Sequence, residues 1–118
     1  MKLGIVGGAG LLGSTTAFVL GMRDVVEEIK LVDLNENAAK NQAMDMGQAI
    51  LPFSATKITA AGYADLGDCE VILVTANAST RQVTDRSERL KDNMGLLGPI
   101  TKEIKTYCKQ DPVVIICA

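Results

Sequence analysis

Glycines gather near the start of the chain in a spacing that suits a bound phosphate. The stretch GIVGGAGLLGS contains two overlapping patterns, G-x-G-x-x-G from Gly8, Gly10 and Gly13, and G-x-x-G-x-x-G when Gly7 takes the place of Gly8. Glycine allows a tight turn and a close approach to a pyrophosphate, and a helix start offers unpaired N–H groups. Because Val6 ends the apolar run directly before Gly7, the strand should end at Gly7. That register favours Gly7, Gly10 and Gly13, with Gly8 adding slack.

An acid follows this loop at the distance that a dinucleotide site requires. Asp33 lies 20 residues after Gly13, at the end of the stretch EIKLVD. A carboxylate there can accept hydrogen bonds from both ribose hydroxyls and would repel a 2′-phosphate. No arginine follows Asp33 closely, so NAD is preferred over NADP. A tight turn with a capping acid and no nucleotide is the alternative, but the loop, the acid and their spacing coincide.

The elements that must position these residues alternate along the chain. Apolar runs predict strands over 2–7, 28–33, 57–61, 70–75 and 113–117. Periodicity and capping residues predict helices over 11–22, from the Asn35 cap to about Ile50, and over about 86–109. This order predicts an α/β fold of the Rossmann type, a doubly wound parallel sheet in a three-layer αβα arrangement. Ligands of such sheets bind at the carboxyl ends of the strands.

The apolar residues also predict which surfaces are covered. The helix over 11–22 and the strand over 113–117 should be buried, and a proline in the last helix, within Gly98-Pro99, predicts a kink or break there. One face of that helix is predicted to be buried by Leu90, Met94, Leu97, Ile100, Ile104 and Tyr107.

Composition excludes several classes of function. The chain has 118 residues, a net charge of −2 and 47% hydrophobic residues, which fits one domain over 1–118 and gives no basic footprint for nucleic acid or an anionic membrane. Its three cysteines are scattered, so we expect free thiols in a reducing compartment, a cytoplasmic protein and no metal site. The end of the chain at the carboxyl end of the fifth strand suggests a domain cut from a longer protein, without its C-terminal substrate domain.

Five motifs together resemble the NAD-binding N-terminal domain of the lactate/malate dehydrogenase family. They are GGAGLLG, LVDLNE, AMDMGQA, ILVTAN and RSERLKDN, and they occur in the family's order over essentially the whole chain. The seven-residue glycine loop is more similar to malate-type members. The resemblance implies NAD as cofactor, a small 2-oxo or 2-hydroxy acid as substrate, hydride transfer between them, and a homodimer or homotetramer.

The resemblance also assigns roles to single residues. Arg86 matches the catalytic arginine that closes over the substrate and polarises its carbonyl, which suits a guanidinium that keeps its proton. Asn93, two helical turns later, matches an asparagine that contacts cofactor and substrate. The residues expected to bind the cofactor are Gly7, Gly8, Ala9, Gly10, Leu11, Leu12, Gly13, Asp33, Thr75, Ala76, Asn77 and Asn93. Those expected to bind the substrate are Thr80, Arg81, Arg86 and Asn93.

The chain departs from the family pattern at two positions and lacks one residue type. Thr80 stands where Arg suits malate and Gln suits lactate, although Arg81 beside it could reach a second carboxylate. Asn77 replaces the usual glycine after Thr75 and Ala76. The chain has no histidine, the family's proton donor, so these residues alone should bind NAD without turnover.

Three other interpretations stay open from the sequence. GGAGLLGS also resembles the GGAGFIGS start of extended short-chain dehydrogenases and epimerases, a family that does not need the Arg86-to-Asn93 helix after a polar loop. NAD-dependent glycosidases share the fold but usually carry a different second strand. A non-catalytic NAD-sensing module would account for the missing general acid, but not for an arginine behind a polar loop.

Overall fold

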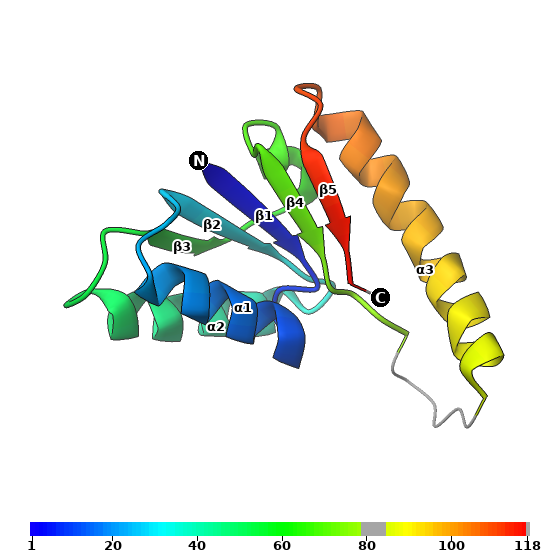
Figure 1. Ribbon diagram of the computed structural model, residues 1–118, viewed down its shortest axis with the longest axis horizontal. Helices are drawn as coiled ribbons and strands as arrows, with labels where there is room; N and C mark the ends of the chain where they lie inside the picture. Colours follow the sequence, from blue (N-terminus) through cyan, green and yellow to red (C-terminus); the bar gives the residue numbers. More distant parts are fainter. Residues whose placement is uncertain (79–84, 118) are drawn as a thin grey trace.

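Five parallel strands form one sheet in the computed structural model, which describes residues 1–78 and 85–117 (Figure 1). The strand order is β3-β2-β1-β4-β5, so the chain leaves β1 toward one edge and returns beside β1 with β4. The strands are β1 (Lys2–Val6), β2 (Glu28–Val32), β3 (Lys57–Ala60), β4 (Val71–Val74) and β5 (Val113–Ile116). The helices are α1 (Leu11–Met22), α2 (Glu36–Ile50), the short 3-10 helix η1 (Tyr63–Leu66) and α3 (Arg86–Tyr107). The predicted doubly wound α/β fold is confirmed.

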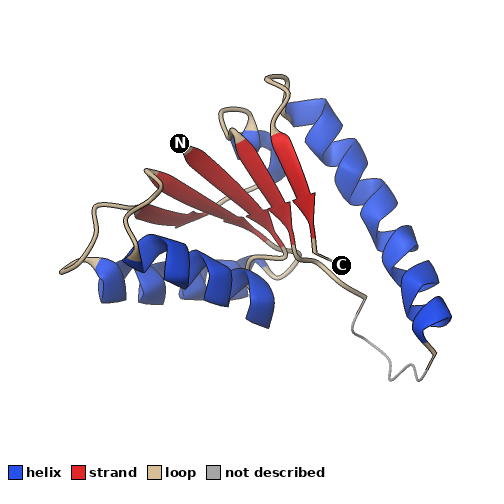
Figure 2. Cartoon of the chain, in the orientation of Figure 1, coloured by secondary structure: helices blue, strands red, loops and turns tan. Residues whose placement is uncertain are grey.

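Alternate residues of the strands enter two separate cores, one on each face of the sheet. Ile5, Ile29 and Leu31 pack with α1 and α2 on one face. Ile72 and Val74 pack with η1 and α3 on the other face. Figure 2 shows the helices placed around the central sheet in this way, which gives the three layers predicted from the alternation.

The fifth strand is not buried, contrary to the prediction from its apolar sequence. All four residues of β5 are exposed, from 41% at Val114 to 62% at Val113. β5 is one of the two edge strands, and in the described part of the chain it pairs with β4 alone. At the other edge Ile58 of β3 is buried with α2, whereas no residue of β5 joins either core in residues 1–78 and 85–117. An apolar run predicts a strand that can be buried, but the position of that strand in the sheet decides what covers it.

Two helices are also less buried than their sequences predict. On α1 only Gly13, Ala17 and Gly21 are buried, while Leu11 is 87% exposed. On α3 the predicted face is buried at Ile100 and Ile104 but exposed at Leu90, Met94 and Tyr107. Figure 1 shows the reason for α3, whose first turns extend beyond the carboxyl ends of the strands.

Helix α3 continues through Pro99 without the predicted break. A proline removes one backbone hydrogen bond, and the buried side chains of Ile100 and Ile104 hold the following turn against the sheet. Although α3 has 22 residues, no helix in residues 1–78 and 85–117 is long and apolar enough to cross a membrane.

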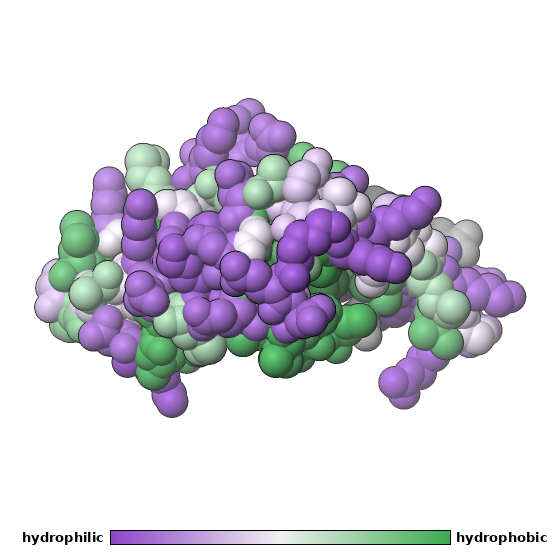
Figure 3. Space-filling model, turned by 90° about the horizontal axis from the view of Figure 1, so that it is seen from above, coloured by the Kyte–Doolittle hydropathy of each residue, from purple (hydrophilic) through white to green (hydrophobic). Residues whose placement is uncertain are grey.

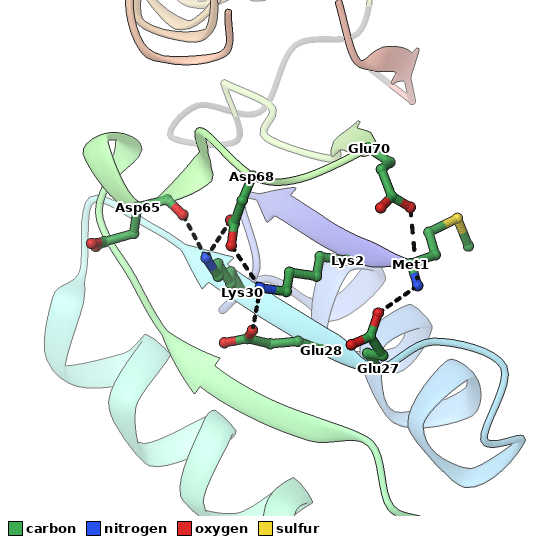
Figure 4. Close-up of polar contacts among 8 residues, drawn as sticks. All are labelled: Met1, Lys2, Glu27, Glu28, Lys30, Asp65, Asp68 and Glu70. Carbon is green, nitrogen blue, oxygen red and sulfur yellow. Dashed lines mark hydrogen bonds and ion pairs between the residues drawn. The ribbon is translucent and has the colours of Figure 1, made fainter. Parts of the chain in front are cut away.

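Charge pairs tie the amino ends of the central strands together (Figure 4). Lys2 Nζ on β1 and Lys30 Nζ on β2 each lie 2.7 Å from a carboxylate oxygen of Asp68, which precedes β4. Lys30 Nζ also donates to the carbonyl oxygen of Asp65 at 2.7 Å. The hydrogen bonds from Lys2 and Lys30 lower the pKa of Asp68 from 3.8 to about 2.

Seen from above, hydrophilic residues dominate the middle of the molecule, and apolar residues gather along one border (Figure 3).

Replacement of this carboxylate should reduce stability in a pH-dependent way. The folded-state pKa of Asp68 lies below its ordinary value, so its contribution is fully present above about pH 4 and is lost as the pH falls toward 2. The Asp68 side chain is 47% exposed, so we expect Asp68→Asn to lower the free energy of unfolding at pH 7 by only about 1 kcal/mol. Urea unfolding at pH 7 and at pH 2 should show this difference disappearing. Glu70→Gln is the control, because the Glu70 carboxylate lies 4.0 Å from the N-terminal amine. A loss of unfolding free energy in Asp68→Asn that persists at pH 2 would contradict the assignment.

Candidate functional site

A cavity of about 1440 Å³ opens at the carboxyl ends of the strands. The loop from Gly7 to Gly10 and the start of α1 form one wall, and the residues that follow β2 and β4 form the next. The middle of α3 closes the far side. This is the position that the doubly wound topology predicts for a ligand, where the chain reverses its direction across the sheet.

Gly7 makes the sharp turn at the end of β1. It is the only glycine with a positive φ, +85°, among those of residues 1–78 and 85–117. A Cβ at this position would lie 2.6 Å from the backbone nitrogen of Ala76, so a side chain is excluded by both the backbone conformation and the neighbouring strand end. The N–H groups of Gly7 and Gly8 both donate to the carbonyl oxygen of Val32, which joins the loop to β2.

Gly13 lets helix α1 approach this turn closely. A Cβ at Gly13 would overlap the carbonyl oxygen of Gly7 and would lie 2.8 Å from Oγ1 of Thr75. The Thr75 hydroxyl is buried and lies 3.1 Å from the carbonyl oxygens of Val6 and Gly7, to which its hydrogen can be donated. Thr75, predicted as a cofactor-binding residue, therefore also connects the end of β4 to the glycine loop.

The two remaining glycines have different surroundings. Gly10 is the N-cap of α1 and lines the cavity, and it offers no side chain to cap the helix. The first N–H groups of the helix, including those of Leu11 and Leu12, therefore point toward the cavity end of α1 without an intrahelical acceptor. Gly8 faces away, since a Cβ there would lie 2.9 Å from Cβ of Leu31. Its function in the structure is close packing on β2, a more definite one than the predicted slack.

Asp33 stands at the cavity directly after β2, as predicted. Its Oδ2 accepts a hydrogen bond from the N–H of Ala9 at 3.0 Å, and its Oδ1 accepts one from the N–H of Asn35 at 3.0 Å. Asn35 in turn caps α2, with its side chain accepting from the N–H of Ala38. Each carboxylate oxygen has two lone pairs, so Asp33 can still accept a hydroxyl hydrogen at each oxygen.

Of the other predicted site residues, some line the cavity and others do not. Ala76 and Asn77 line the cavity after β4. Asn93 on α3 does not line it; the side chain is 7% exposed, and its Oδ1 accepts from the N–H of Ala78 at 2.9 Å. Arg86 is exposed at the first residue of α3, whose N-cap Asp85 accepts from the N–H of Ser87. Thr80 and Arg81 lie outside the described residues.

Sequence reasoning missed the wall that α3 contributes. Leu96, Pro99, Ile100 and Glu103 line the cavity from the middle of this helix. Their spacing of three and four residues marks a single helical face, but the predicted buried face of this helix shares only Ile100 with it. Tyr63 of η1 lines the same region, and its pKa is raised by burial and by the nearby charges of Glu103 and Asp33.

The geometry fits a dinucleotide better than a metal ion. A cradle without Cβ atoms at Gly7 and Gly13, free N–H groups at a helix start and a carboxylate after β2 are the three parts that such a ligand needs. The residues described in the structure contain no group of three metal-ligating side chains.

Comparison with known proteins gives a consistent match. The family described as "lactate/malate dehydrogenase, NAD binding domain" matches residues 1–118. A malate dehydrogenase of Anoxybacillus flavithermus is 33% identical over 98% of this chain, and an L-lactate dehydrogenase of Clostridium perfringens is 30% identical over 98%. The chain spans only 38% and 36% of the lengths of these relatives.

A solved structure has the same fold. The malate dehydrogenase of Archaeoglobus fulgidus, in complex with NADH, matches with a TM-score of 0.87 and 33% identity, over 98% of this chain and 40% of that chain. These matches confirm the predicted resemblance and favour it over the short-chain dehydrogenase and glycosidase alternatives.

The contact between Gly13 and Gly7 can be tested with a single methyl group. Gly13→Ala should lower the free energy of unfolding by about 2 kcal/mol, because the added Cβ must displace the Gly7 carbonyl or the Thr75 hydroxyl. Gly95→Ala is the matched control in α3, since a Cβ there meets nothing within 4 Å, and it should raise stability by about 0.5–1 kcal/mol. Urea unfolding measures both variants, and a stable Gly13→Ala protein would show that the close approach is dispensable.

Proposed function

We propose that the cavity at the carboxyl edge of the sheet holds NAD(H) for a 2-hydroxy-acid dehydrogenase. The premise is that this chain belongs to the lactate/malate dehydrogenase family, as its NAD-binding domain. The observation that carries this proposal is the arrangement of the glycine loop, in which Gly7 and Gly13 bring the start of α1 next to the end of β4. The backbone N–H groups at the start of α1 then point to the carboxyl edge of the sheet, where a pyrophosphate would accept hydrogen bonds from them.

The cavity offers residues for three parts of the dinucleotide. The N–H groups of Leu11 and Leu12 at the start of α1 would hold the pyrophosphate. Asp33 would accept the hydroxyls of the adenosine ribose. Beyond Asp33, the ring of Tyr63 and the side chain of Ile100 offer apolar surface for the adenine base.

Charge in the cavity supports NAD over NADP. The carboxylates of Asp33, Glu36 and Glu103 all line the described part of the cavity, and neither lysine nor arginine does. A 2′-phosphate would therefore meet several negative charges and no cation. Glu36 also stands in the first turn of α2, where it offsets the positive end of the helix that could otherwise attract that phosphate.

The substrate would be a small 2-oxo or 2-hydroxy acid, with NAD(H) supplying or accepting the hydride. Arg86 would donate hydrogen bonds to the substrate carbonyl as negative charge develops on its oxygen. We propose Asn93 as a further contact to cofactor and substrate, and Thr80 and Arg81 as substrate contacts. The chain contains no histidine, so the histidine that the family resemblance implies as proton donor is not among its 118 residues.

Two proposals concern the location and the assembly of the protein. We propose a cytoplasmic location, supported by free thiols at the buried Cys69 and Cys108 and the exposed Cys117. We also propose that the dehydrogenase is a homodimer or homotetramer, as the family resemblance implies.

Cofactor preference is the first test of the proposal. Calorimetry should show NADH binding at least about tenfold more tightly than NADPH, since one unfavourable charge contact of about 1.4 kcal/mol has this effect. Asp33→Ala should weaken NADH binding because two hydroxyl contacts are lost. Asp45→Asn, on an exposed part of α2 away from the cavity, removes one acid without changing the preference. Equal affinities for both dinucleotides would refute the assignment.

Arg86 is expected to affect substrate and not cofactor. Because its side chain is exposed at the start of α3 and does not line the cavity, Arg86→Gln should leave the NADH dissociation constant within about twofold of the original. In a dehydrogenase that carries this chain, the same change should lower kcat/KM for a 2-oxo acid by at least about a hundredfold. A large loss of NADH affinity would instead place Arg86 in the cofactor site.

A further inference from the structure

The contacts of Asp33 connect it to the glycine loop as well as to the cavity. Its Oδ2 accepts the N–H of Ala9, which lies 24 residues earlier in the chain and between the glycines of the loop. Its Oδ1 accepts the N–H of Asn35 at the start of α2. One carboxylate therefore bridges the loop after β1 and the loop after β2.

This bridge decides which N–H groups of the loop remain available to a ligand. The N–H groups of Gly7 and Gly8 are engaged by the Val32 carbonyl, and that of Gly10 is engaged by the Gly7 carbonyl. Ala9 is the remaining member of the loop, and Asp33 engages its N–H. With these four satisfied internally, the donors left for an anion are those of the first turn of α1.

We infer that Asp33 is a positioning residue for pyrophosphate binding, in addition to any hydrogen bond that it makes to a ribose. It holds Ala9 toward β2, and this fixes the direction in which the loop delivers the start of α1 to the phosphates. The binding part of this inference rests on the proposed function, whereas the contact between Asp33 and Ala9 does not.

The two roles differ in their dependence on the ribose hydroxyls. If Asp33 acted only on the ribose, its removal would cost nothing for a ligand without hydroxyls at the 2′ and 3′ carbons. Removal of a negative charge close to the phosphates would even strengthen the binding of such an anion. If removal of Asp33 weakens the binding of such a ligand, the change is opposite to the one that electrostatics predicts. The loss of affinity then reports a change in the position of the loop.

The experiment compares ADP with 2′,3′-dideoxy-ADP on the 118-residue chain by calorimetry. For Asp33→Ala we expect at least about a tenfold loss of affinity for dideoxy-ADP, because the charge-assisted hydrogen bond from Ala9 is removed. The loss of affinity for ADP should be larger, because the contacts to the ribose hydroxyls are removed as well. Asp33→Asn keeps one acceptor oxygen and should recover part of the dideoxy-ADP affinity. Asp45→Ala is the matched control, because it removes the same charge from an exposed part of α2 away from the cavity. It should leave both affinities unchanged.

Amide hydrogen exchange without ligand separates this inference from the proposed function. The Ala9 amide should exchange at least about tenfold faster in Asp33→Ala than in the original chain, and at an unchanged rate in Asp45→Ala. Unchanged exchange at Ala9, or an undiminished affinity of Asp33→Ala for dideoxy-ADP, would overturn the positioning role. If the original chain bound neither ADP nor NADH while Ala9 exchange still depended on Asp33, the cofactor assignment would fail and the bridge itself would stand.

Discussion

The close approach of α1 to the ends of β1 and β4 is the constraint on which the site depends. Three groups meet there without room for a further carbon atom: the Gly7 carbonyl, the α-carbon of Gly13 and the hydroxyl of Thr75. The positive φ of Gly7 turns the chain into this position. Any side chain at Gly7 or Gly13 would push α1 outward, and the N–H groups of its first turn would no longer meet the end of the sheet where a ligand lies.

The two ends of the sheet are held by different kinds of interaction. At the amino ends, exposed or partly exposed charges of Lys2, Lys30 and Asp68 join three chain segments, and water and salt limit what such pairs contribute. At the carboxyl ends, backbone groups and a buried hydroxyl join β1, β2 and β4 at short range. The carboxyl end can therefore stay fixed in the absence of ligand, which reduces the ordering needed for binding.

Sequence reasoning succeeded where the signal is local. The glycine spacing, the acid after β2 and the helix cap at Asn35 each depend on a few neighbouring residues, and the structure confirms where they lie. It failed where the outcome depends on distant neighbours. The exposure of β5 depends on which elements pack on each edge strand, and the part of α3 that faces the cavity depends on how this helix lies against the sheet. Asp33 illustrates both cases, because its place was predictable but its contact with Ala9 requires the loop and β2 to be seen together.

Helix α3 connects Arg86, the segment after β4 and the far wall of the cavity. Arg86 begins it, Asn93 lies about 10 Å further along its axis, and Glu103 about 15 Å beyond that. Asn93 is buried and holds the N–H of Ala78, directly after the cavity residue Asn77. A shift of the helix against the cavity wall would therefore be transmitted to Ala78 and to Arg86 together, because both are joined to the same helix. The missing break at Pro99 matters for this reason, since a break there would separate the wall at Ile100 and Glu103 from the end of the helix that carries Arg86.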